Sequence, residues 1–140
     1  MASRRLADMV RNRKPVTMPA TATVKKACQC MRDQRVGAVL VTDRKKRLIG
    51  IFTGRDAVER MLAEGREPAK TRLSEVMTAS PATLRSDRTP VDALRLMQEG
   101  AFRHVPVVED GLVVSVISRG DFRALEQAQL DEQTGIWERI

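Results

Sequence analysis

Aromatic side chains and histidine are scarce in this chain of 140 residues. It has one tryptophan, three phenylalanines, no tyrosine and a single histidine, His104. A surface that stacks single-stranded nucleic acid needs aromatic rings among its basic residues, and the basic stretches here have none. No Ser–His–Asp set, Cys–His pair or Walker loop is evident, and a zinc site would lack histidine pairs and a CxxC. The sequence therefore predicts neither a catalytic constellation nor a metal site.

Long apolar runs are also missing. No stretch approaches the roughly 18 apolar residues that cross a bilayer. The first residues, MASRRLADMVRNRK, lack the apolar core of a signal peptide. We therefore expect a cytoplasmic protein with no membrane partner.

Cysteine is limited to Cys28 and Cys30, two positions apart in an expected helix. Side chains at this spacing point about 200° apart around a helix, which argues against a disulfide and against a shared metal. We expect two buried thiols.

The net charge of +7 raises the question of a nucleic-acid partner. Much of the excess lies in the first 14 residues and in RKKR at 44–47, which we place in a turn between strands. Such a turn is usually a solvated tip, so the sequence does not favour nucleic acid. A nucleic-acid-binding regulator that uses the basic N-terminus stays open as an alternative.

One phrase occurs twice, as GIFTGRD at 50–56 and SVISRGD at 115–121. Each has a small residue, two large apolar residues, a hydroxyl residue, two spacers and an aspartate. Four further segments repeat in order, at offsets of 65–67 residues: RLADMV with RLSEVM, PVT with PAT, TVKKACQCM with TPVDALRLM, and VGAVLVTD with FRHVPVVE. One register held over five segments predicts an internal repeat.

Each half is predicted to run helix, strand, helix, strand, strand, helix, from its apolar spacing and its β-branched runs. We expect a first domain at 1–64 with a basic N-terminal helix, and a second domain at 72–126. The segment 65–71 is the expected linker, and 127–140 is a tail whose Trp137 either docks on a protein surface or frays. Neither half can cover its own sheet, so the two should pack about a pseudo-twofold axis.

Two interpretations fit the repeated phrase. A hydroxyl residue three positions before an acidic residue at a helix start forms a capping box. The same carboxylate can accept two hydrogen bonds from a cis-diol, and free N–H groups at a helix start suit a phosphate. Thr53 with Asp56, and Ser118 with Asp121, can serve either role or both. Pro106 lies in an expected strand but cannot donate a ladder bond, which predicts an open edge for a planar ligand.

The repeat, the twin phrases and FRHVPVV together resemble a tandem pair of cystathionine-β-synthase (CBS) domains, a Bateman module, over about residues 5–125. The resemblance implies an α/β (α+β) fold of two CBS motifs. Each motif would be a small three-stranded sheet with flanking helices. It also implies two clefts for an adenosine nucleotide, AMP, ADP or ATP, or in some members NAD or S-adenosylmethionine. No catalytic cofactor is implied.

The resemblance further implies roles for single residues. The aspartates of the phrase would accept bonds from ribose hydroxyls, with the hydroxyl residues beside them. The basic pair before the second strand would contact phosphate, and two threonines would flank adenine. The nucleotide-binding candidates are Thr17, Thr53, Arg55, Asp56, Thr83, Arg103, His104, Pro106, Ser118, Arg119 and Asp121.

The halves differ, because repeat one lacks the basic pair and the proline, and Ser115 replaces Gly50. We therefore expect clefts of unequal affinity, one of which could be empty. The more phosphorylated ligand should bind in the cleft of Asp121, Arg103 and His104.

These observations predict a non-enzymatic sensor whose ligand changes domain or dimer packing. A homodimer would form through the exposed helix faces near 57–64 and 92–99, and the output would pass to an unidentified effector protein. The sequence also leaves open a protein-interaction scaffold without ligand and a cryptic nucleotide-processing enzyme.

Overall fold

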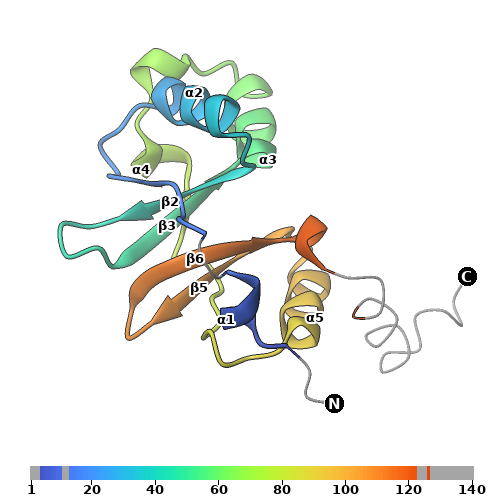
Figure 1. Ribbon diagram of the computed structural model, residues 1–140. Coiled ribbons are helices and arrows are strands. Elements are labelled where there is room, and N and C mark those ends of the chain that lie inside the picture. The colour runs from blue at the N-terminus through green and yellow to red at the C-terminus, as the bar shows by residue number, and fades with distance from the viewer. Residues whose placement is uncertain (1–3, 11–12, 123–125, 127–140) are drawn as a thin grey trace, which may run out of the picture.

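Figure 1 shows the computed structural model, which describes residues 4–10, 13–122 and 126. The first repeat forms α1 (Leu6–Met9), β1 (Thr17–Met18), α2 (Val24–Gln34), β2 (Ala38–Thr42), β3 (Leu48–Thr53), α3 (Gly54–Asp56) and the π-helical turn η1 (Ala57–Leu62). The linker forms the 3₁₀ turn η2 (Pro68–Lys70). The second repeat forms α4 (Leu73–Val76), β4 (Thr78–Ala79), α5 (Pro90–Gly100), β5 (His104–Glu109), β6 (Leu112–Ser118) and the 3₁₀ turn η3 (Arg119–Asp121). The predicted α/β fold is confirmed, whereas the predicted tail with Trp137 lies outside the described residues.

The two long helices begin and end in the same way. Thr23 caps α2 by accepting a hydrogen bond from the Lys26 N–H, and Thr89 caps α5 by accepting one from the Asp92 N–H. At the other ends, Arg35 and Ala101 both take the left-handed conformation with φ 56°. These matched ends lie 66 residues apart, so the repeat read from the sequence is also a structural repeat.

The strands form two sheets. One has the order β1-β2-β3-β4, in which β1 runs parallel to β2 and the other pairs are antiparallel. The other is the antiparallel pair β5-β6, with a single parallel bridge from Leu84 to Val107 where β1 would stand in the first sheet. The predicted three strands per half thus become four strands in one sheet and two with a bridge in the other.

The first helix of each repeat packs against the opposite half. Leu6 is fully buried in a core with Ala93 and Val105, whereas Leu73 is fully buried in the core that contains Val24. Backbone hydrogen bonds hold each short helix to the opposite repeat. The Leu6 N–H donates to the Arg88 carbonyl and the Leu73 N–H donates to the Ala22 carbonyl, both at 2.9 Å. Figure 1 shows α1 beside α5 and α4 beside α2. The domain boundaries predicted from the sequence follow the repeat, while the packing units exchange their first helices.

A third apolar cluster joins the two sheets. Ala38, Leu40 and Ile51 are buried there, and Val113 and Val116 of β6 pack against them. The Leu48 N–H also donates to the Gly111 carbonyl at 3.3 Å, at the same edge. The two halves therefore meet face to face through β2, β3 and β6.

Both cysteines are free, as predicted. They are half-buried, however, and not buried as expected. Cys28 packs at the border of the first core, where burial raises the pKa of its thiol, and the Cys30 sulfur accepts a weak hydrogen bond from Gln34 at 3.4 Å.

Candidate functional site

A cavity of about 520 Å³ lies between the two halves at Asp56. The repeated phrase supplies one wall, because β3 ends at Thr53 and a helix starts at Gly54. The second repeat supplies the other wall. The lining residues are Gly37, Ile51, Thr53, Gly54, Arg55, Asp56, Glu59, Thr78, Pro81, Ala82, Phe102, Arg103 and His104. We call this space the Asp56 cavity; its volume falls in the range of small-molecule sites.

The capping box at Asp56 is formed. Asp56 Oδ2 accepts hydrogen bonds from the Thr53 N–H at 2.9 Å and the Thr53 hydroxyl at 3.2 Å. The Asp56 N–H in turn donates to Thr53 Oγ1 at 3.2 Å. The other oxygen, Oδ1, faces the Arg60 Nε at 3.6 Å, and Asp56 is 9% exposed. The box thus uses one carboxylate oxygen, while the other, among the residues that the structure describes, has only the long ion pair with Arg60.

Two arginines and a histidine form the basic side of this cavity. Arg55 is held by Glu59 at 2.9 Å and by the Ala101 carbonyl at 3.1 Å. Arg103 is exposed at the mouth. Burial, aided by the nearby Arg103 charge and opposed by Asp121, lowers the pKa of His104. His104 is therefore predominantly neutral at pH 7, which makes Arg103 the cation best placed to meet an anionic ligand.

A second cavity of about 370 Å³ lies at Asp121. Its lining residues are Arg13, Lys14, Pro15, Val16, Arg35, Val36, Gly37, Ala38, His104, Ser115, Val116, Ser118 and Asp121. The same box recurs here, since Asp121 Oδ2 accepts from the Ser118 N–H at 2.7 Å and the Ser118 hydroxyl at 3.1 Å. We call this space the Asp121 cavity.

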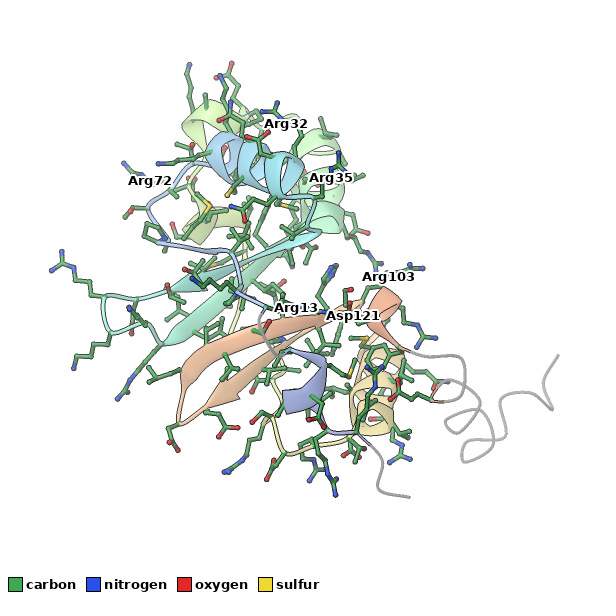
Figure 2. The ribbon with its side chains drawn as sticks, in the orientation of Figure 1. Arg13, Arg32, Arg35, Arg72, Arg103 and Asp121 are labelled. Carbon is green, nitrogen blue, oxygen red and sulfur yellow. The ribbon has the colours of Figure 1, made fainter. Side chains whose placement is uncertain are left out.

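The Asp121 carboxylate differs from its repeat mate because Arg13 binds it. Arg13 Nη1 lies 2.8 Å from Oδ2, and the two labelled side chains meet between the halves in Figure 2. Burial works to raise the pKa of Asp121, but the Ser118 hydrogen bonds and the Arg13 guanidinium outweigh it and hold the pKa below its ordinary value. Asp121 is therefore ionised at neutral pH.

The structure separates residues that the sequence placed together. Arg103 lines the Asp56 cavity and not the Asp121 cavity, so the predicted grouping of Arg103 with Asp121 is wrong. His104 lines both cavities. Each cavity combines the phrase of one repeat with residues that precede a strand of the other repeat.

Thr17 and Thr83 are exposed and line neither cavity. The residues just before them, Pro15 and Val16 in one half and Pro81 and Ala82 in the other, line the cavities instead. Arg119 likewise lines neither cavity.

Pro106 is buried and lines neither cavity. It does, however, leave a backbone carbonyl without its hydrogen-bond donor beside the Asp56 cavity. Its repeat mate Leu40 donates its N–H to the Val16 carbonyl at 2.9 Å. Proline has no N–H to donate to the equivalent carbonyl of Ala82. Within residues 4–10, 13–122 and 126, no backbone N–H bonds that carbonyl. The second half therefore lacks the backbone hydrogen bond that Leu40 makes in the first, although Leu84 pairs with the same edge of β5.

Sequence reasoning missed Arg13, Lys14, Arg35 and Gly37 as cavity residues. The first two belong to a basic N-terminus whose charge alone assigns them no site. The repeat itself held the signal, because Pro15 is the mate of Pro81 and both precede a cavity residue.

Both repeats match the family model of the CBS domain, at residues 6–63 and 73–127. The chain belongs to the CBS domain family. CBS pairs are regulatory modules, and the family resemblance of the sequence is confirmed.

Curated plant relatives are similar to this CBS pair over only part of their own length. The CBS domain-containing protein CBSCBSPB3 of Arabidopsis thaliana is 42% identical over 113 residues, which make up 81% of this chain and 20% of that protein. The mitochondrial CBSX3 of the same plant is 30% identical over 103 residues, 71% of this chain and 50% of that protein. The chain thus spans about a fifth to a half of the length of these relatives.

Solved CBS structures share the fold. The CBS domain protein PAE2072 from Pyrobaculum aerophilum, complexed with AMP, has a TM-score of 0.82 and 26% identity, covering 91% of this chain and 98% of that one. ATU1752 from Agrobacterium tumefaciens has a TM-score of 0.77 and 30% identity, covering 89% and 98%. In the part of this CBS pair that the structure describes, no helix has the length and apolar character required to cross a membrane.

Proposed function

We propose that this CBS pair is a non-enzymatic sensor that binds an adenosine nucleotide in the Asp56 cavity. The observation that carries the proposal is the half-used Asp56 carboxylate, which lines a cavity of about 520 Å³ at a helix start. The solved relative from Pyrobaculum aerophilum is complexed with AMP, which supports this choice of ligand.

The cavity offers a partner for each part of such a nucleotide. Asp56 Oδ1 would accept the ribose hydroxyls in exchange for its 3.6 Å contact with Arg60. Arg103 would contact the phosphate with its planar set of donors. The Ala82 carbonyl, which Pro106 leaves without an N–H, would accept from the adenine amino group.

The ligand would act by joining the two halves. Asp56 comes from the first repeat, while Ala82 and Arg103 come from the second. A ligand that contacts both halves favours the arrangement in which both sets of contacts form, and shifts the equilibrium by its differential affinity. An effector protein would then read the changed arrangement.

The test is thermal unfolding of the full chain with AMP, ADP, ATP, NAD and S-adenosylmethionine. A ligand at about 100 times its dissociation constant adds roughly 2.7 kcal/mol, which should raise the melting temperature by about 5–10 °C. Asp56→Asn keeps the size of the side chain but removes its charge, so we expect about tenfold weaker binding of the active nucleotide.

Asp33→Asn is the matched control, because Asp33 is an exposed carboxylate on α2 that lines neither cavity. It should bind the nucleotide as the unaltered chain does. If no adenosine ligand shifts the melting temperature of nucleotide-free protein, the twin phrases are capping boxes alone and the module is a scaffold.

We further propose that the CBS pair forms a homodimer through the helical face at 57–64. Val58 and Leu62 are 57% and 75% exposed there, which is unusual for large apolar residues one turn apart. Leu62→Glu should convert the dimer to a monomer, as measured by light scattering at micromolar concentration. A dimer of this variant would have to bury the glutamate charge in an apolar contact. Glu64→Gln, on the same segment, should leave the mass unchanged. A monomeric unaltered chain would exclude the dimer.

Two basic residues that a nucleic-acid-binding regulator would use are engaged in ion pairs within the chain. Arg4 binds Glu126 through two bonds of 2.7 and 2.6 Å, and Arg13 binds Asp121. Both guanidinium groups therefore have acidic partners in the folded chain. This pairing favours the nucleotide sensor over a nucleic-acid-binding regulator.

A further inference from the structure

Four consecutive cations lie at the tip of the hairpin that joins β2 and β3, and we call residues 44–47 (RKKR) the basic tip. All four residues are exposed, and in the part of the chain that the structure describes none of their side chains forms an ion pair or a hydrogen bond. Arg32, Arg55 and Arg60 of the same repeat, by contrast, each pair with a carboxylate. In Figure 2, side chains that end in nitrogen spread from this hairpin away from the rest of the molecule. The basic tip therefore keeps its charges available to a partner.

Asp43 fixes the backbone of the basic tip. Its carboxylate oxygen Oδ1 accepts the Lys45 N–H at 2.8 Å and the Arg47 N–H at 2.9 Å. Its backbone N–H donates to the Arg47 carbonyl and its carbonyl accepts the Lys46 N–H, both at 3.0 Å. These four hydrogen bonds hold a single backbone conformation, so a partner would not have to order the turn on binding.

The tip of the second hairpin lies beside the basic tip. The Leu48 N–H donates to the Gly111 carbonyl, and Arg47 forms an antiparallel bridge with Leu112. Leu112 is 46% exposed, so an apolar side chain adjoins the four cations. We call the two tips together, residues 43–47 and 109–112, the joined tips.

The cations outnumber the available carboxylates at the joined tips. Asp43 is engaged by the backbone of its own turn. The Glu109 carboxylate accepts hydrogen bonds from the N–H of Ser86, at 3.0 Å, and from its hydroxyl. This leaves Asp110 as the carboxylate of the tips that has no hydrogen bond among the described residues. The surface thus presents four cations and an exposed leucine beside one available aspartate.

Protection of a sheet edge does not account for the four cations. Lysine side chains often keep open strand edges from pairing with other chains. The start of β3 is not open, because it pairs with β2 on one side and bonds to Gly111 on the other. The tip charges are therefore not required at this edge, and binding is the role that they suit.

The joined tips suit an acidic protein segment better than a nucleic acid or a membrane. A nucleic acid would place its row of phosphates against Asp110 as well as against the cations, and the tips have no aromatic residue to stack a base. A membrane surface would need more apolar side chains than Leu112 alone. A protein segment can match every feature, with acidic residues on the cations, an apolar residue on Leu112 and a basic residue on Asp110.

We propose that the joined tips dock an acidic segment of another protein, with glutamate or aspartate side chains against 44–47 and an apolar side chain on Leu112. This goes beyond the proposed function, because it names the surface to which an effector protein binds. The tips precede β3 and β6, whereas the repeated phrases follow the same strands, so the tips lie at the opposite end of the sheets from the phrases (Figure 1). The segment and a nucleotide can therefore bind at the same time.

Fluorescence anisotropy with the full chain at fixed ionic strength tests this surface. The probes are two fluorescein-labelled synthetic peptides of equal length, one of glutamates only and one with a leucine at its centre. Arg44→Glu combined with Lys45→Glu should weaken both peptides at least about tenfold, because two attractive contacts become repulsive. The melting temperature should stay unchanged, since neither side chain has a partner in the described part of the chain.

Lys25→Glu combined with Lys26→Glu is the matched control. Both lysines are exposed on the first turn of α2, line neither cavity and lie outside the joined tips. The net charge changes by the same amount, so this variant measures the nonspecific loss of attraction. Equal losses of peptide binding in the two double variants would overturn the proposal.

Leu112→Ala separates the apolar contact from the charges. It should weaken the peptide with the central leucine severalfold and leave the all-glutamate peptide unchanged. The same result for both peptides would contradict the contact at Leu112.

Two further probes distinguish the class of partner. These are vesicles that contain phosphatidylserine and a fluorescein-labelled DNA duplex of mixed sequence. If either one binds more tightly than the peptides and loses its binding in the Arg44→Glu, Lys45→Glu variant, the protein partner is excluded.

The failure of this inference differs from that of the proposed function. If AMP binds through Asp56 but the Arg44→Glu, Lys45→Glu variant binds the peptides as the unaltered chain does, only the docking surface is excluded. If the tips bind the peptides as expected but no adenosine ligand binds, the nucleotide sensor is excluded and the docking surface remains.

Discussion

Leu6→Ala should lower the free energy of unfolding by about 3 kcal/mol. Leu6 is 0% exposed, and it belongs to the core of the opposite half with Met97, Val105 and Ile117. Its helix has only four residues, so packing and not intrinsic helix propensity holds it in place. Urea unfolding followed by circular dichroism measures the change. Leu73→Ala should show a similar loss, because Leu73 occupies the equivalent position in the other half.

Leu112→Ala is the control for the same chemical change at an exposed site. Leu112 is 46% exposed, so its truncation should stay within about 0.5 kcal/mol. If Leu6→Ala also lost less than about 1 kcal/mol, α1 would not be part of the folded core. The exchange of first helices between halves would then be wrong.

The order of elements could be predicted because its signals are local. Thr23 and Thr89 stand at helix starts, and apolar spacing marks the buried faces of α2 and α5. The twin phrases also predicted the capping boxes that form at Asp56 and Asp121. Each of these features depends on residues within about one turn of one another.

The crossed packing could not be predicted in this way. The sequence around Leu6 does not determine whether this leucine packs on its own repeat or on the other one, since both cores accept a leucine from a short helix. The wrong grouping of Arg103 with Asp121 also needed tertiary information. The Arg103 carbonyl accepts the Arg119 N–H at 2.9 Å, so its backbone lies beside the Asp121 phrase, but its side chain lines the cavity of the other repeat.

The assignment of Thr17 and Thr83 to the cavities failed for a different reason. The segment was correct, but it lines the cavities only up to Val16 and Ala82, and the threonines that follow are exposed. The repeat aligned the two threonines with each other and could not say which side they face.

Gly37→Leu should weaken ligand binding in both cavities by about thirtyfold. Gly37 lines both of them, and a Cβ there would lie 2.9 Å from His104 Nε2 and 3.2 Å from Cε1. The backbone itself allows a side chain, because the repeat mate of Gly37 is Arg103 and φ at Gly37 is outside the left-handed region. The added atoms therefore displace His104 into the cavities, where it takes space from a ligand, and a thirtyfold loss corresponds to about 2 kcal/mol of binding free energy. Calorimetric titration with the active nucleotide measures it.

Gly120→Ala is the control glycine, since its Cβ would meet nothing within 4 Å and it lines neither cavity. Its binding should be unchanged. His104→Ala provides the decisive comparison, because the repeat mate of His104 is Ala38, which leaves room for Arg103 in the other half. Combined with Gly37→Leu, it removes the clash, so the double variant should bind better than Gly37→Leu alone. Additive losses in this double-mutant cycle would show that the leucine blocks the cavities directly and that the contact with His104 plays no part.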